Sequence, residues 1–123
     1  SATGLVRLAK RYFEKNAKDS ILNNKEITAK EVFDAAKAGD EAALEITEEF
    51  GAYLGQALVN LAATVDPAVF VIGGGVSKAG DILLDIVKKY FYKHAFYGNQ
   101  KTKITLATLG NDAGIYGAAK QVL

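Results

Sequence analysis

Apolar residues recur every three or four positions through the first half of the chain, which is the spacing of one buried face of an α-helix. This pattern predicts helices over about 3–16, 28–37 and 41–64. A polar connector over 17–26 separates the first helix from the second. The first half is therefore predicted to be almost entirely helical.

Two of these helices begin with recognisable capping signals. Thr28 and Glu31, three residues apart, form the pattern of a capping box. Asp40 directly follows Gly39, so a glycine that stops one helix precedes a side chain that caps the next. These signals place the turns between the helices.

The longest predicted helix, over 41–64, carries two glycines four residues apart, Gly51 and Gly55. Glycine inside a helix costs about 1 kcal/mol relative to alanine, so we expect another element to approach the backbone closely here. Asp66-Pro67 ends the helix, because the residue before a proline avoids helical geometry. The residues expected on its apolar face are Ile46, Phe50, Tyr53, Leu54, Ala57, Leu58, Leu61 and Val65.

The second half begins with a continuous apolar run over 68–72 that ends in three glycines. Such a run is typical of a strand buried on both faces of a parallel sheet. We predict a helix from Ser77 to about His94, a second strand over 103–109 and a last helix over 113–123, which gives the order β-α-β-α. The residues expected to point inward from the first of these helices are Leu83, Val87, Tyr90 and Phe91.

Two strands do not form a stable sheet by themselves. We therefore interpret residues 1–123 as an incomplete α/β domain, with 1–66 helical and 67–123 forming the β-α-β-α unit. The chain contains no methionine, not even at position 1, so it is expected to start downstream of a natural translation start.

Composition excludes several classes of protein. The 123 residues, 50% hydrophobic and 24% charged, are typical of one ordinary globular domain and not of a disordered chain. The lack of cysteine removes disulfides, thiolate metal sites and cysteine nucleophiles. A net charge of +1 without a basic stripe argues against nucleic-acid binding. No apolar stretch reaches the roughly 18 residues of a membrane span, and no secretory signal is present.

The strongest chemical signal is the segment over 71–77, a buried strand that ends in Gly73, Gly74 and Gly75 before a helix start. Glycines let the backbone approach a ligand, and a helix amino terminus favours anions, which suits a nucleotide. The dinucleotide fingerprint lacks its last glycine, because Lys78 stands there, and no P-loop Lys-Ser/Thr follows Gly80. A simple tight turn is the alternative interpretation, and both stay open.

A second strand-to-helix corner lies over 108–114. Open α/β sheets bind ligands at the carboxyl ends of their strands, so the two corners are expected to share one cleft. Asp112 is expected to cap the helix that follows, and His94, the single histidine, is expected to be a surface cation. With one histidine and no cysteine, no catalytic constellation can be assembled.

Four segments together resemble the C-terminal part of bacterial glucokinases of the ROK family of repressors and sugar kinases. The resemblance spans essentially the whole chain, in order and spacing. These segments are Ser1-Ala2-Thr3-Gly4, Val71-Ile72-Gly73-Gly74-Gly75-Val76-Ser77, Lys89-Tyr90-Phe91 with Ala95-Phe96, and Leu109-Gly110-Asn111-Asp112-Ala113-Gly114.

The resemblance implies the C-terminal part of a ribonuclease-H-like domain of the actin-like ATPase fold. It also implies a cytoplasmic kinase that transfers the γ-phosphate of ATP, with Mg²⁺, to glucose or a related hexose, and it leaves polyphosphate open as the donor. The residues that match the family's adenosine motif are Gly73, Gly74, Gly75, Val76 and Ser77.

The phosphate loop, the catalytic aspartate and the structural zinc motif of the family would all lie before Ser1. The resemblance therefore assigns no catalytic and no metal residue here, and the isolated chain is expected to be inactive. Family members are commonly dimers or tetramers, so self-association is expected. Two other functions stay open, a sugar-sensing transcriptional regulator of the same family and a non-catalytic self-association module.

Overall fold

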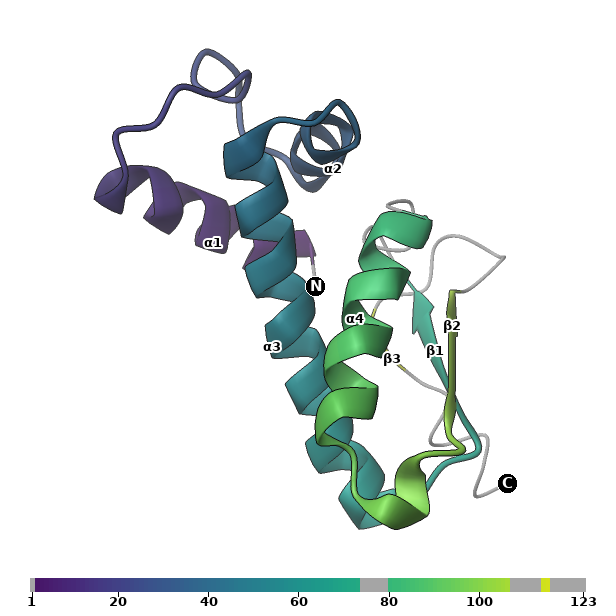
Figure 1. Ribbon diagram of the computed structural model, residues 1–123. Helices are drawn as coiled ribbons and strands as arrows, with labels where there is room; N and C mark the ends of the chain where they lie inside the picture. The colour runs from purple at the N-terminus through teal and green to yellow at the C-terminus, as the bar shows by residue number, and fades with distance from the viewer. Residues whose placement is uncertain (1, 74–79, 107–113, 116–123) are drawn as a thin grey trace.

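The computed structural model describes residues 2–73, 80–106 and 114–115. A group of helices lies at one end, and a long helix runs from it alongside a small sheet (Figure 1). The elements are α1 (Ala2–Lys15), α2 (Ala29–Lys37), α3 (Glu41–Val65), β1 (Val69–Gly73), α4 (Asp81–His94), the 3₁₀ turn η2 (Tyr97–Asn99), β2 (Lys103–Leu106) and β3 (Gly114–Ile115).

The predicted helix ends in the first half are confirmed. The Thr28 hydroxyl accepts a hydrogen bond from the Glu31 backbone N–H at 3.1 Å, at the start of α2. Asp40 does the same for the Ala43 N–H at 3.0 Å, at the start of α3. Asp66 ends α3 in the left-handed conformation, with φ 46°. Local signals thus determine where these helices start and stop.

The sheet has the strand order β2-β1-β3 among the described residues. β1 and β2 are parallel as predicted, with Val69 opposite Lys103 and Ile72 opposite Leu106. The helix predicted over 113–123 was wrong at its start. Gly114 and Ile115, which were expected to be helical, form β3, antiparallel to β1. The free edge of β1 supplies backbone partners that a local pattern does not reveal. Residues 107–113 and 116–123 lie outside the described part.

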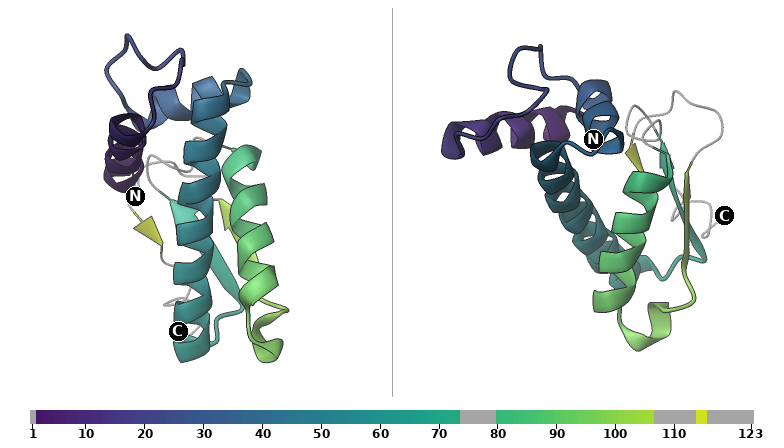
Figure 2. Two further views of the ribbon diagram at one scale, coloured as in Figure 1. Left: turned by 60° about the vertical axis from the view of Figure 1, so that its left-hand side comes forward. Right: turned by 45° about the horizontal axis from the view of Figure 1, so that its top comes forward.

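α3 and α4 lie side by side on one face of the sheet (Figure 2). Phe70 from β1 and Phe91 from α4 meet edge to face in this layer, with ring centroids 6.0 Å apart. Both are fully buried. Val69 and Val71 on β1 are only half-buried, so the strand alternates instead of being buried on both faces as predicted. The described helices cover one face of the sheet, which accounts for the alternation.

The close approach predicted at Gly51 and Gly55 is confirmed, and α4 is the partner. A Cβ at Gly51 would lie 2.2 Å from Cγ2 of Ile86. A Cβ at Gly55 would lie 2.8 Å from Cβ of Tyr90 and 3.1 Å from the carbonyl oxygen of Val87. The two helices therefore meet almost backbone to backbone.

The buried face of α3 is rotated from the predicted one. Tyr53 and Leu61, expected to point inward, are 63% and 38% exposed, and Ala57 is also exposed. α4 packs on the strip of α3 that contains Gly51 and Gly55, the glycine strip, so the buried side of α3 is centred on that strip instead. Its members are Ala42, Ala43, Ile46, Thr47, Phe50, Gly51, Gly55, Leu58, Val59 and Ala62.

α4 begins later than predicted. Its first residue is Asp81, and Gly80, not Ser77, precedes it in the capping position. Gly80 has φ 67° and ψ −146°, which is incompatible with a continuing helix and accessible mainly to glycine. The helix expected from Ser77 therefore cannot run through this position. None of the described helices is both long enough and apolar enough to cross a bilayer.

Candidate nucleotide site

Of the five residues in the predicted adenosine motif, the structure describes Gly73. It is buried and ends β1, the central strand of the three. The other four predicted residues, Gly74, Gly75, Val76 and Ser77, lie outside the described residues. Their role in binding a nucleotide stays a prediction, and the structure supplies the frame on either side of them.

The sheet register pairs one glycine from each of the two corners. Gly73, at the carboxyl end of β1, lies opposite Gly114, at the amino end of β3. Gly114 is the described residue of the second corner, whose residues 108–113 lie outside the described part. The cleft expected between the two corners therefore stays a prediction. Asp112 lies outside the described residues, and the helix that it was expected to cap does not include Gly114 or Ile115.

On the far side of the glycine turn, α4 begins without a side-chain cap. Gly80 has no side chain to accept a hydrogen bond from the first turn of the helix. The amino end of a helix carries partial positive charge and free N–H groups, which favour a negatively charged group. The carboxylate of Asp81, in the first turn, partly offsets this charge. This frame offers backbone N–H groups to a ligand.

An electrostatic link joins Glu48 on α3 to α4, and the sequence did not predict it. The Lys89 Nζ lies 2.6 Å from Oε2 of Glu48, and the Tyr90 hydroxyl donates to the same oxygen. Partial burial raises the pKa of Glu48, but these two hydrogen bonds outweigh it and hold the pKa below its ordinary value. Glu48 and Lys89 are 41 residues apart, so no local pattern could have paired them.

His94, expected at the surface, is exposed at the carboxyl end of α4. Phe91, expected to point inward, belongs to the core, whereas Phe96 and Tyr97 are 62% and 96% exposed. Within the described ranges, no group of three or more His, Cys, Asp or Glu side chains is arranged to hold a metal ion.

A cavity between α1 and α3 was not predicted from the sequence. The only signal for it was the helical spacing of Arg7 and Arg11.

Comparison with known proteins gives one consistent family. The sequence model of the ROK family matches residues 1–123. A glucokinase from Halalkalibacterium halodurans is 41% identical over 122 residues, covering 95% of this chain and 37% of that protein. The chain thus spans little more than a third of the length of this curated relative.

Solved structures agree with the sequence comparison. A ROK family glucokinase from Streptomyces griseus, crystallised with glucose and AMPPNP, superposes with a TM-score of 0.80 at 32% identity, covering 98% of this chain and 41% of that one. A ROK family transcriptional regulator, a homologue of the E. coli MLC protein, gives a TM-score of 0.73 at 22% identity, covering 86% of this chain and 27% of that one. At that identity, the second likeness concerns the fold alone. The fold is that of the C-terminal part of a ribonuclease-H-like domain of the actin-like ATPase type.

Proposed function

The chain belongs to the ROK family, and from that premise we propose that the protein containing it is an ATP-dependent glucokinase. The reaction would move the γ-phosphoryl group of ATP to a hydroxyl of glucose, giving ADP and glucose 6-phosphate. The observation that carries the proposal is the likeness, over nearly the whole chain, to the Streptomyces griseus glucokinase that binds glucose and AMPPNP. AMPPNP is an unreactive analogue of ATP, so that protein accommodates both halves of the reaction.

We assign the adenosine side of the nucleotide to this segment. Gly73 at the end of β1, with Gly74, Gly75, Val76 and Ser77 after it, would let the backbone lie against the nucleotide. The pairing of Gly73 with Gly114 in the sheet supports this assignment. Phosphoryl transfer needs positioning and charge stabilisation more than covalent chemistry, and Mg²⁺ neutralises phosphate charge when it is bound. No residue of this chain is assigned as a Mg²⁺ or zinc ligand.

The catalytic base and the sugar contacts are proposed to lie in the remainder of the protein. The 123-residue chain by itself is therefore expected to have no kinase activity. The cytoplasm is the proposed location, and a homodimer or homotetramer is the proposed assembly. Sedimentation of the full protein, at several concentrations, measures the assembly directly.

The test is glucose-dependent ADP production by the full protein, with the 123-residue chain assayed in parallel. We expect turnover from the first and none from the second. Binding of glucose without turnover would contradict the kinase and favour the transcriptional regulator. The absence of both glucose binding and turnover would favour the non-catalytic self-association module. Turnover by the short chain would contradict the assignment of the catalytic groups to the remainder.

A further inference from the structure

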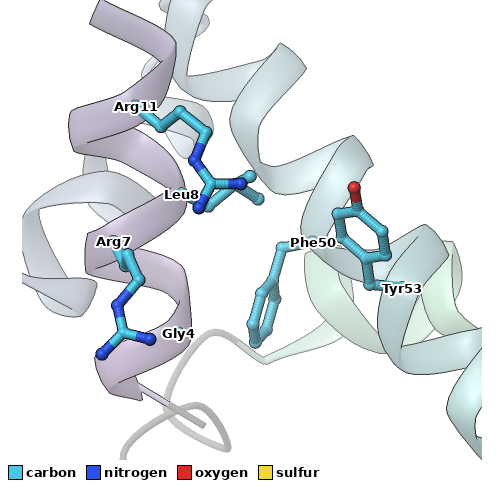
Figure 3. A pocket seen from close by; sticks show the side chains of 6 residues that line it. All are labelled: Gly4, Arg7, Leu8, Arg11, Phe50 and Tyr53. Carbon is cyan, nitrogen blue, oxygen red and sulfur yellow. The ribbon is translucent and has the colours of Figure 1, made fainter. Parts of the chain in front are cut away.

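A cavity of about 260 Å³ lies between α1 and α3. Arg7 and Arg11 line it from α1, and Phe50 and Tyr53 line it from α3. Figure 3 shows the Arg11 side chain reaching from α1 toward α3, while the Arg7 side chain runs along α1 toward Gly4. The remaining lining residues are Gly4 and Leu8. Since Arg7 and Arg11 are four residues apart, they lie on the same face of their helix. Two arginines and two aromatic residues therefore line one cavity.

Arg7 and Arg11 carry positive charge at this cavity without an ion-pair partner among the described residues. Among the described residues, the ion pairs involve only lysines, and neither Arg7 nor Arg11 takes part in one. A smaller adjoining hollow of about 80 Å³ adds Lys15 and one acid, Glu49, to the surroundings of Arg11. Together the two hollows are lined by three cations and one carboxylate. The planar guanidinium group of an arginine suits the oxygens of a phosphate group, which it can bind in bidentate fashion.

The other wall is apolar and aromatic. Phe50 is only 8% exposed and belongs to the core, so its position is held by packing. Tyr53 is 63% exposed, and its hydroxyl has no hydrogen-bond partner among the described residues. An aromatic ring offers a flat apolar surface with a polar tip, which suits the C–H face of a sugar ring and its hydroxyls. The small volume favours a ligand of monosaccharide size over a larger one.

We propose that this cavity binds a hexose phosphate, with its phosphate on Arg7 and Arg11 and its sugar ring against Phe50 and Tyr53. The choice of the sugar rests on the proposed function, since glucose 6-phosphate is the product of that reaction. Product bound here gives the protein a sensor for its own product, on a surface formed by α1 and α3.

The test is calorimetric titration of the 123-residue chain with glucose 6-phosphate, glucose, inorganic phosphate and AMP. We expect glucose 6-phosphate to bind more tightly than the other three. Arg7→Gln and Arg11→Gln should each weaken it by about tenfold or more, the effect of losing a charged hydrogen bond. Tyr53→Ala should reduce the affinity for glucose 6-phosphate towards that for inorganic phosphate. The circular dichroism spectrum of each variant checks that the helices persist.

Lys10→Gln is the matched control, because it removes one positive charge from the same helix without lining the cavity. It should change the affinity less than twofold. Equal losses from Lys10→Gln and Arg11→Gln would reduce the effect to general electrostatics and overturn the proposal. Equal affinity for inorganic phosphate, tighter binding of AMP, or no binding to the folded chain would also overturn it. A full protein that lacks kinase activity while this chain binds glucose 6-phosphate would refute the proposed function alone.

Discussion

The two sides of α3 are packed in opposite ways. Toward α4, Gly51 and Gly55 bring the helix backbones so close that even a methyl group would collide with Ile86 or Tyr90. Toward α1, the same helix leaves a cavity of about 260 Å³. The first side has no room for a ligand and fixes the helix layer on the sheet. The second side exposes Arg11 and Tyr53. We therefore expect ligand binding on the α1 side and a contribution to folding stability on the α4 side.

The largest effect is expected from adding a methyl group on the tight side. Gly55→Ala should destabilise the chain by about 1–3 kcal/mol, because the new Cβ meets backbone atoms of α4 that cannot move aside. The higher helix propensity of alanine offsets part of this, by about 1 kcal/mol. Urea unfolding of the 123-residue chain gives the free energy directly. Gly98→Ala is the control, since a Cβ there would meet nothing within 4 Å, and equal losses from both would contradict the tight packing.

A smaller effect is expected from the Glu48 link on the same side of α3. Glu48→Gln should cost about 0.5–1 kcal/mol, because the ion pair with Lys89 is partly exposed and screened by solvent. Glu49→Gln, at the neighbouring exposed position, should change the free energy of unfolding by less than about 0.5 kcal/mol. An equal loss from the two variants would show that the link to Lys89 and Tyr90 contributes nothing.

The Glu48 link also predicts a pH dependence. Its pKa in the folded chain lies below the ordinary value of 4.5, so the unfolded chain binds more protons near that pH. The contribution to stability is therefore fully present above pH 4.5 and is lost as the pH falls through the lowered folded pKa. The difference in unfolding free energy between the original chain and Glu48→Gln should shrink in that acid range. A difference that grows on acidification would contradict the assigned direction.

The smallest effect is expected on the open side. Arg11→Gln should leave the free energy of unfolding within about 0.5 kcal/mol, since its guanidinium has no ion-pair partner among the described residues. The same urea titration measures it. A loss comparable to that of Gly55→Ala would mean that the α1 side is a packed interface and not an open one.

Local signals predicted local features well. The caps at Thr28 and Asp40 and the glycine strip of α3 follow from residues at most four apart, and the structure has all of them. β3 escaped prediction because a two-residue strand exists only through its pairing with β1, more than forty positions earlier. Tyr53 was wrongly predicted to be buried. Because α3 is apolar around much of its surface, the spacing of its apolar residues does not show which side α4 covers.

In the candidate site, too, local features could be predicted from the sequence and long-range contacts could not. The strand that ends at Gly73 could be predicted from sequence, because a short apolar run followed by glycines is a local signal. The role of the glycines that follow stays a prediction. The juxtaposition of Gly73 and Gly114 depends on strand pairing, and the pairing of Glu48 with Lys89 depends on helix packing. Distant residues that meet only in the fold leave no periodic trace in the chain.

The glycines after β1 are proposed to bind the nucleotide, and the KM for ATP is the measurement that tests this. Gly74→Val in the full protein should raise the KM for ATP by about tenfold or more, equivalent to losing about 1.4 kcal/mol of binding, while the KM for glucose stays unchanged. Gly98→Val, at an exposed turn, should leave both values unchanged. An unchanged KM for ATP in Gly74→Val would contradict the account and leave the glycines as a structural corner.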